Sequence, residues 1–163
     1  MQLPICNECA KTGVLCQKCA EKLKKGEINE FEVQVYNAIA SSADRFNLAE
    51  VDVERAINLG TTVVLLTRGN PGILIGKAGS TAGEISKMIG KKVRVIKILP
   101  DPKKTIQEII SPAILLGINE VYKPEGKFFK IRIKKTKKLT IPEENLVNAF
   151  SSLLGGQVIL SFE

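Results

Sequence analysis

The sequence predicts an α+β protein in which a small N-terminal cysteine knuckle is followed by two similar helix–strand units. Three observations lead to this prediction. All four cysteines lie within the first 19 residues, helical and strand-like patterns alternate over the rest of the chain, and part of that pattern recurs 65 residues later. The chain has 163 residues, which is enough for two small domains sharing an interface. We therefore divide it into residues 1–27, 28–100 and 101–163.

The cysteines form two Cys-x-x-Cys pairs separated by six residues, at Cys6, Cys9, Cys16 and Cys19. Each pair can present two thiolates to one point, and two pairs complete the tetrahedral site that zinc prefers. The short gap favours a treble-clef-like knuckle over a zinc ribbon. We predict one Zn²⁺ with a structural role, because four cysteines leave no open position for a substrate. Two disulfides and an iron–sulfur cluster are the alternatives, and the cytoplasmic location that we expect argues against disulfides.

Apolar periodicity and glycine or proline breaks predict the remaining elements in order. The first unit should contain a helix, two strands, a short helix, a glycine loop, a helix and a strand, at residues 30–46, 51–57, 61–67, 73–75, 76–79, 81–89 and 92–99. The second should contain a helix, two strands, a helix and a strand, at residues 103–110, 113–122, 128–134, 142–154 and 157–162. Residues 85–93 match residues 150–158 in their apolar positions, and a helix-ending glycine recurs as Gly90 and Gly155. We predict two copies of one unit; a chance likeness of two helix–strand joints is the alternative.

The positive charge of the chain is concentrated on particular segments. The net charge is +7, and residues 68–104 carry nine basic and two acidic side chains. Residues 123–138 carry eight basic side chains and one acidic. Such segments suit a phosphate-bearing partner, although solvated lysines on strand edges would give the same counts.

Catalytic chemistry finds little support in the composition. The chain has no histidine, so the commonest general base and the usual catalytic triads are absent. Residues 72–77 superficially suggest a nucleotide-binding P-loop, but the spacing is one residue short, and Ala78 stands where Mg²⁺ binding needs Ser or Thr. We therefore expect a binding protein and not an enzyme.

Residues 73–85 resemble the core of KH domains, whose pattern is Ile-Gly-x-x-Gly followed by an apolar residue in the next helix. The element order resembles the type II KH fold, and the paired units resemble the tandem KH region of NusA-like transcription factors, particularly the short archaeal ones. The resemblance covers roughly residues 31–163 and excludes the cysteines. It implies a clamp for about four nucleotides of single-stranded RNA. The residues implied at the clamp are Ile75, Gly76, Lys77, Ala78, Gly79 and Ser80, beside an apolar groove for which Ile73, Ile75, Ile85 and Val95 are candidates.

The second copy departs from the KH pattern at its loop, which lies near residues 135–140 and contains no glycine. We therefore expect a degenerate KH-like unit that assists RNA binding by charge, through Lys135, Lys137 and Lys138. A basic loop that only keeps the domain soluble is the alternative.

The resemblance implies a cytoplasmic RNA-binding protein with a role in transcription elongation or termination. RNA polymerase and the ribosome are the candidate macromolecular partners, and we expect a monomer. The longest apolar runs are too short to span a bilayer. The competing hypothesis is a protein-binding scaffold associated with the ribosome or with RNA processing.

Overall fold

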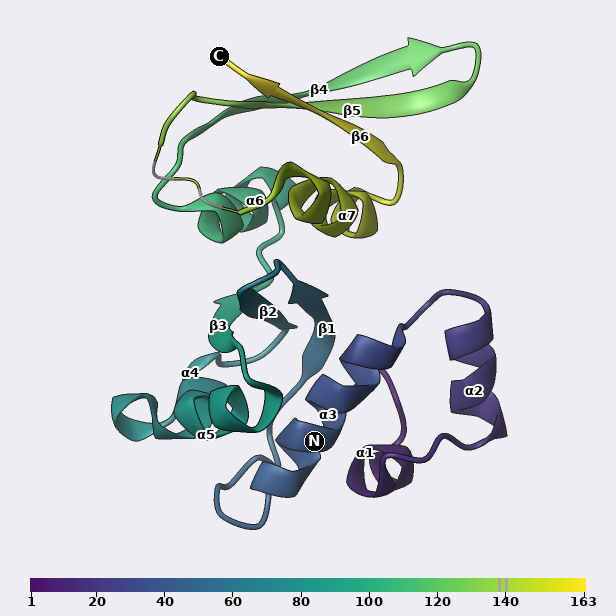
Figure 1. The fold of residues 1–163 in the computed structure, drawn as a ribbon, viewed down its shortest axis with the longest axis vertical. Helices are drawn as coiled ribbons and strands as arrows, with labels where there is room; N and C mark the ends of the chain where they lie inside the picture. The colour runs from purple at the N-terminus through teal and green to yellow at the C-terminus, as the bar shows by residue number, and fades with distance from the viewer. Residues whose placement is uncertain (138, 140) are drawn as a thin grey trace. The chain divides into compact units, whose positions relative to one another are not determined.

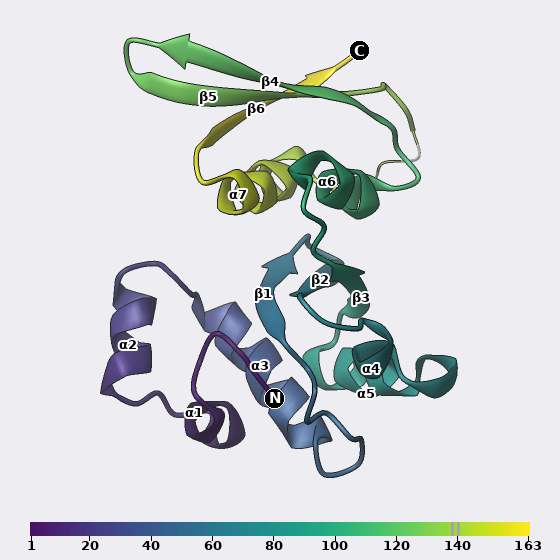
Figure 2. The same ribbon diagram turned by 180° about the vertical axis from the view of Figure 1, so that it is seen from behind.

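The computed structural model describes residues 1–137, 139 and 141–163 (Figures 1 and 2). It confirms the predicted α+β class. Contacts within the described residues separate two compact units, Met1–Lys97 and Ile98–Glu163. Among the described residues, none of the helices is long and apolar enough to cross a membrane.

The cysteine segment contains two short helices, α1 (Asn7–Thr12) and α2 (Gln17–Lys24). Each helix begins directly after the first cysteine of a pair, so Cys6 and Cys16 occupy the N-cap positions. Helix α1 ends at Gly13, whose φ of 76° lies in the left-handed region that glycine adopts readily. The chain thereby turns back toward the second cysteine pair.

The first unit continues with an α–β–β–α–β arrangement in the predicted order. Its elements are α3 (Glu30–Ser42), β1 (Val53–Asn58), β2 (Thr62–Thr67), α4 (Gly72–Ile75), α5 (Ser80–Ile89) and β3 (Lys92–Lys97). The sheet order is β1-β2-β3, with β1 and β2 antiparallel and β2 and β3 parallel. Helix α3 starts at a side-chain cap, because Asn29 accepts a hydrogen bond from the Glu32 amide at 2.8 Å.

The cysteine segment and the α–β–β–α–β arrangement share one hydrophobic core. Ile5, Cys9 and Ala10 are buried in the same cluster as Val35 and Ile39 of α3. The N-terminus is also tied to the sheet, since Gln2 exchanges backbone hydrogen bonds of 2.7 and 2.9 Å with residues 51 and 53. The predicted knuckle of residues 1–27 therefore packs against the first sheet unit as part of its core.

The second unit repeats the topology of the first. It contains α6 (Pro102–Ile110), β4 (Leu115–Lys123), β5 (Gly126–Ile133), α7 (Glu143–Leu154) and β6 (Gln157–Phe162). The sheet order is β4-β5-β6, again antiparallel and then parallel. Helices α5 and α7 both end at a left-handed glycine, Gly90 and Gly155, as the sequence repeat predicts. Both α6 and α7 lie on one face of the second sheet (Figures 1 and 2).

Candidate functional site

A tight turn of residues 76–79, here called the glycine turn, joins α4 to α5. Its backbone departs from ordinary conformations at three positions. Gly76 has φ 75° and ψ 172°, Ala78 has φ 55° and ψ 28°, and Gly79 has φ 75° and ψ 16°. The conformation of Gly76 is essentially restricted to glycine, and the left-handed region is unfavourable for most other residues. The two glycines therefore allow a path that few other sequences could follow.

The two glycines meet different surroundings. A Cβ on Gly76 would lie 2.8 Å from the backbone nitrogen of Thr81 and closer still to its hydroxyl oxygen, so the first glycine is packed against α5. A Cβ on Gly79 would meet nothing within 4 Å. The outer side of the turn is consequently open, which leaves room for a ligand backbone to approach the main chain.

The electrostatics of the glycine turn favour an anion. Helix α5 begins at Ser80 with Gly79 as its N-cap, so no cap side chain covers the first-turn amides, and its first turn contains no acidic residue. Amide groups at a helix N-terminus carry a partial positive charge directed at the space before the helix. Lys77 and Ser80 are both exposed beside that space.

A groove of about 460 Å³ opens next to the glycine turn, between α5 and the edge strand β3. Its apolar wall consists of Ile75, Val93 and Val95, its rim carries Lys92 and Arg94, and the small residues Gly79, Ala82 and Gly83 with Ser86 form the helical side. The groove thus combines apolar surface with positive charge.

Two of the four apolar groove candidates occupy the expected position. Ile75, at 39% exposure, and Val95 line the groove. Ile85 does not, because it is fully buried in the hydrophobic core, and Ile73 does not line the groove either. Sequence reasoning missed Lys92, Val93 and Arg94. The signal for them was the alternation of basic and apolar residues in the strand that follows the helix.

The basic loop of the second unit lies between β5 and α7, where the topology places the glycine turn in the first unit. Lys135 and Lys137 are exposed, and Lys138 lies outside the described residues. Between residues 134 and 142, the described part of this loop contains no left-handed residue. Helix α7 also begins with Glu143 and Glu144, which would repel an anion at its N-terminus.

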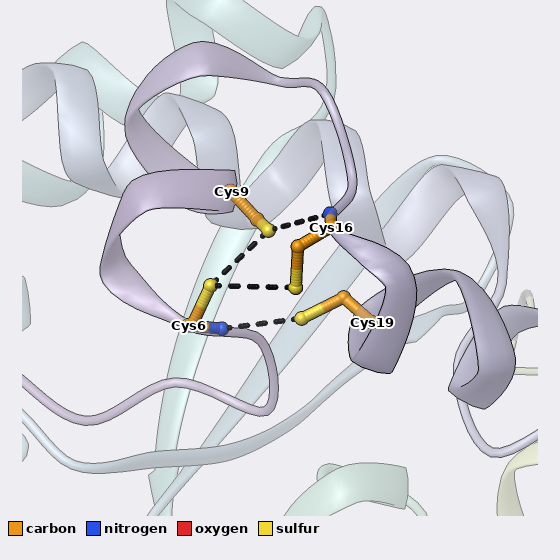
Figure 3. A group of neighbouring side chains, drawn as sticks. All are labelled: Cys6, Cys9, Cys16 and Cys19. Atoms are coloured by element: carbon orange, nitrogen blue, oxygen red, sulfur yellow. Dashed lines mark hydrogen bonds between the residues drawn. The ribbon is translucent and has the colours of Figure 1, made fainter.

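The four cysteine side chains converge on one point (Figure 3). Their sulfur atoms all lie within 4.8 Å of one another. The Sγ atom of Cys6 is 3.1 Å from that of Cys9 and 4.0 Å from that of Cys16, and no disulfide joins them. Backbone amides donate to two of the sulfurs, from Cys16 to Cys9 at 3.1 Å and from Cys6 to Cys19 at 3.5 Å.

The charge balance of these sulfurs fits a metal ion. The backbone N–H of Cys19, together with hydrogen bonds to the neighbouring cysteine sulfurs, lowers the pKa of the Cys16 thiol to about 6. At Cys9 the N–H of Cys16 also favours the thiolate, but the hydrogen bond with the Cys6 sulfur and burial outweigh it and raise the pKa to about 12. A cation would relieve this competition for negative charge. A tetrahedral centre with Zn–S bonds of about 2.3 Å places its sulfurs roughly 3.8 Å apart, a spacing that the observed distances bracket.

Comparison with known proteins identifies the fold around the glycine turn. A family model for the KH domain matches residues 34–126, more than half of the chain, with the glycine turn inside the match. The chain belongs to the KH-domain family. KH domains bind single-stranded RNA through a Gly-x-x-Gly loop, so membership supports RNA binding. The cysteine segment lies outside the matched KH residues.

A solved structure supports the fold of the KH protein over most of its length. The structure titled "Crystal structure of APE1850" superposes with a TM-score of 0.55 at 16% sequence identity. The likeness covers 83% of this chain and 100% of that one, and at this identity it shows the fold alone. No curated protein matches the sequence.

Proposed function

We propose that this KH protein binds single-stranded RNA at the glycine turn and in the adjoining groove. The proposal rests on the observation that the glycine turn and the groove adjoin each other. The open side of the turn, at Gly79, leads into a groove with apolar walls and a basic rim. RNA phosphates would approach the amides at the start of α5, with Lys77 and Ser80 beside them. The attached bases would lie against Ile75, Val93 and Val95.

This arrangement supports the binding of an extended RNA strand. Close approach of a sugar–phosphate backbone requires that no Cβ stands in its way, and Gly79, on the open side of the turn, satisfies that need. Unstacked bases bury their faces against apolar side chains, whereas duplex RNA keeps its bases stacked. The ligand class that fits best is therefore a short stretch of single-stranded RNA.

We propose one structural Zn²⁺ at the cysteine cluster. Four soft thiolate ligands with no free position are typical of such a site. Bound metal would fix α1 and α2 relative to each other, and through Ile5, Cys9 and Ala10 it would support the core packed on α3. The metal would thereby hold residues 1–27 as a folded attachment to the KH unit of residues 28–100.

The second unit, residues 101–163, would assist RNA binding as a degenerate KH domain. Lys135, Lys137 and Lys138 would attract phosphate by charge, without a backbone clamp. At the cellular level we propose a cytoplasmic, monomeric NusA-like factor of the archaeal type that acts in transcription elongation or termination. The paired α–β–β–α–β units support that assignment, and RNA polymerase would be the partner.

The test is RNA binding by a clamp variant in which Lys77→Asp and Ala78→Asp are combined. Asp tolerates the left-handed conformation of position 78. The variant should fold normally but bind labelled single-stranded RNA about tenfold more weakly, because carboxylates replace a cation beside the phosphate. Lys104→Asp with Asn148→Asp is the matched control, since it changes the net charge equally on α6 and α7. Fluorescence anisotropy that finds both variants equal to the wild type would reject the clamp.

A further inference from the structure

In the described part of the second unit, one face of the sheet carries no helix. Helices α6 and α7 cover the opposite face (Figures 1 and 2). Along the central strand β5, Ile131 and Ile133 are fully buried on the helix side. Because side chains alternate across a strand, Phe128, Lys130 and Arg132 project from the open face.

The strand pattern continues beyond the end of β5. The amide of Lys134 donates to the Ile114 carbonyl at 2.9 Å, and the amide of Lys135 donates to the Glu163 carbonyl at 2.8 Å. Lys134 therefore follows Arg132 on the open face. From strand β4, Lys123 reaches the same face, with its ammonium 4.9 Å from the centre of the Phe128 ring. We call these five residues the basic row: Lys123, Phe128, Lys130, Arg132 and Lys134.

The surroundings of the basic row leave it strongly positive. The register partners of Lys130 are Asn119 and Ile159, and those of Arg132 are Gly117 and Ser161, all uncharged. Among the described residues, Glu163 is the one carboxylate paired with a residue of the row, in an ion pair with Arg132 at 2.7 Å. Arg132, with a smaller contribution from Lys130, lowers the pKa of Glu163. Four cations thus face one carboxylate.

The spacing and composition of the row suit an extended nucleic-acid strand. Alternate residues of a strand lie roughly 6.6 Å apart. The cations on β5 therefore form a line in which neighbouring charges are separated by about that distance. Cations arranged in line can follow a phosphate backbone, and an aromatic ring at one end offers a stacking surface for a base. The ammonium of Lys123 over Phe128 would hold a phosphate close to that stacked base.

We propose that the basic row is a second binding surface for single-stranded RNA, separate from the glycine turn. Phosphates bind along Lys130, Arg132 and Lys134, and one base stacks on Phe128. Duplex RNA fits this surface less well, because its bases are not free to meet the ring. The basic row belongs to the second unit alone, so RNA binding there does not depend on the clamp proposed for the first unit.

The first test compares two charge-reversal variants of the full chain. Lys130→Glu with Lys134→Glu alters the basic row, and Lys103→Glu with Lys104→Glu makes the same charge change on the exposed surface of α6. Anisotropy of a labelled 20-nucleotide oligouridine is measured at several salt concentrations. The row variant should lose affinity beyond the control and flatten the log–log salt dependence by about 1.4, for two lost phosphate contacts. Equal curves for the two variants would overturn the proposal.

The second test addresses the stacked base. Phe128→Leu should weaken binding of the oligouridine roughly fivefold or more, whereas Phe128→Tyr, which keeps the ring, should bind as the wild type does. Thermal unfolding monitored by circular dichroism checks that both variants fold. The assignment would be overturned if Phe128→Leu weakened binding of duplex RNA to the same extent. It would also be overturned if the protein bound oligoglutamate instead of RNA, in a way that depends on Phe128.

Repeating both tests in the clamp variant, Lys77→Asp with Ala78→Asp, separates the two surfaces. If the basic row binds RNA, its variants weaken the binding that the clamp variant retains. A clamp variant with normal affinity would instead reject the glycine turn while leaving the result for the basic row intact.

Discussion

The two glycines of the turn are expected to differ sharply when each is replaced by alanine. Gly76→Ala should destabilise the first unit severely, whereas Gly79→Ala should destabilise it mildly and act mainly on RNA binding. Both positions have positive φ, so both substitutions introduce backbone strain. Only the Cβ at position 76 would also collide with α5, at 2.8 Å from the backbone nitrogen of Thr81.

The expected losses of stability follow from the backbone strain and from the collision with α5. Strain at a left-handed alanine costs about 1–2 kcal/mol, which is the full expected loss at Gly79. At Gly76 the glycine-only conformation costs about 1–3 kcal/mol, and forced overpacking adds about 1–3 kcal/mol. Gly76→Ala should therefore lower the free energy of unfolding by roughly 2–6 kcal/mol. Adding Thr81→Ala should restore only part of this, because the backbone nitrogen of residue 81 remains in place.

The assay is urea denaturation followed by circular dichroism, with anisotropy measured on whichever variants remain folded. In Gly79→Ala the new methyl group points into the open side of the turn, so affinity for single-stranded RNA should fall while the fold survives. Equal destabilisation by the two substitutions would refute the packing argument. Full affinity in Gly79→Ala would refute the close approach of RNA at that residue.

Three further outcomes are expected. Gly83→Ala should stabilise α5 by about 0.5–1 kcal/mol, since alanine is the better helix former, yet weaken RNA binding because its methyl group enters the groove; unchanged affinity would remove Gly83 from the site. Metal analysis of protein purified without added zinc should find one zinc per chain, and chelation should lower the thermal stability of the first unit while leaving the second folded; metal-free protein with native disulfides would reject the site. Glu32→Gln should flatten the pH dependence of stability relative to the wild type. Burial raises the pKa of Glu32 in the folded protein. Its contribution to the free energy of unfolding is therefore most favourable below the unfolded pKa of about 4.3 and declines as pH rises through the folded pKa. Parallel curves of stability against pH for the variant and the wild type above pH 4 would contradict this.

The regular elements of both units were predictable from sequence because local patterns determine them. Strand β2 is an unbroken β-rich apolar run, and it is buried from Val63 to Thr67. Gly90 and Gly155 each mark the end of a helix, and both adopt the left-handed conformation that ends it. The topology of two equal sheets then follows from the repeated order of elements.

Features that depend on distant contacts were not predictable in the same way. Helix α1 has only six residues, and its sequence shows no apolar periodicity that would signal it. Burial of Cys9 and Ala10 against α3 depends on contacts between segments more than 20 residues apart. The sequence therefore did not reveal that residues 1–27 share a core with α3.

The groove shows the same limit on a smaller scale. Ile85 was a candidate base contact because it follows the Gly-x-x-Gly loop at the family's apolar position. Its position on α5 directs the side chain into the core, where it is fully buried. The groove is lined instead by the adjacent helical positions Ala82, Gly83 and Ser86, together with the edge of β3. Only the packing of α5 on the sheet reveals which residues remain at the surface.

RNA recognition at the glycine turn is tested most directly by recording the amide NMR spectrum of the full chain during titration with a four-nucleotide single-stranded RNA. We expect shifts in the amides of Gly76 to Ser80 and in those of Val93 and Val95. A four-nucleotide ligand matches the length that one KH clamp holds. Saturable shifts confined to other residues, with the glycine turn and β3 unchanged, would contradict RNA recognition at this site.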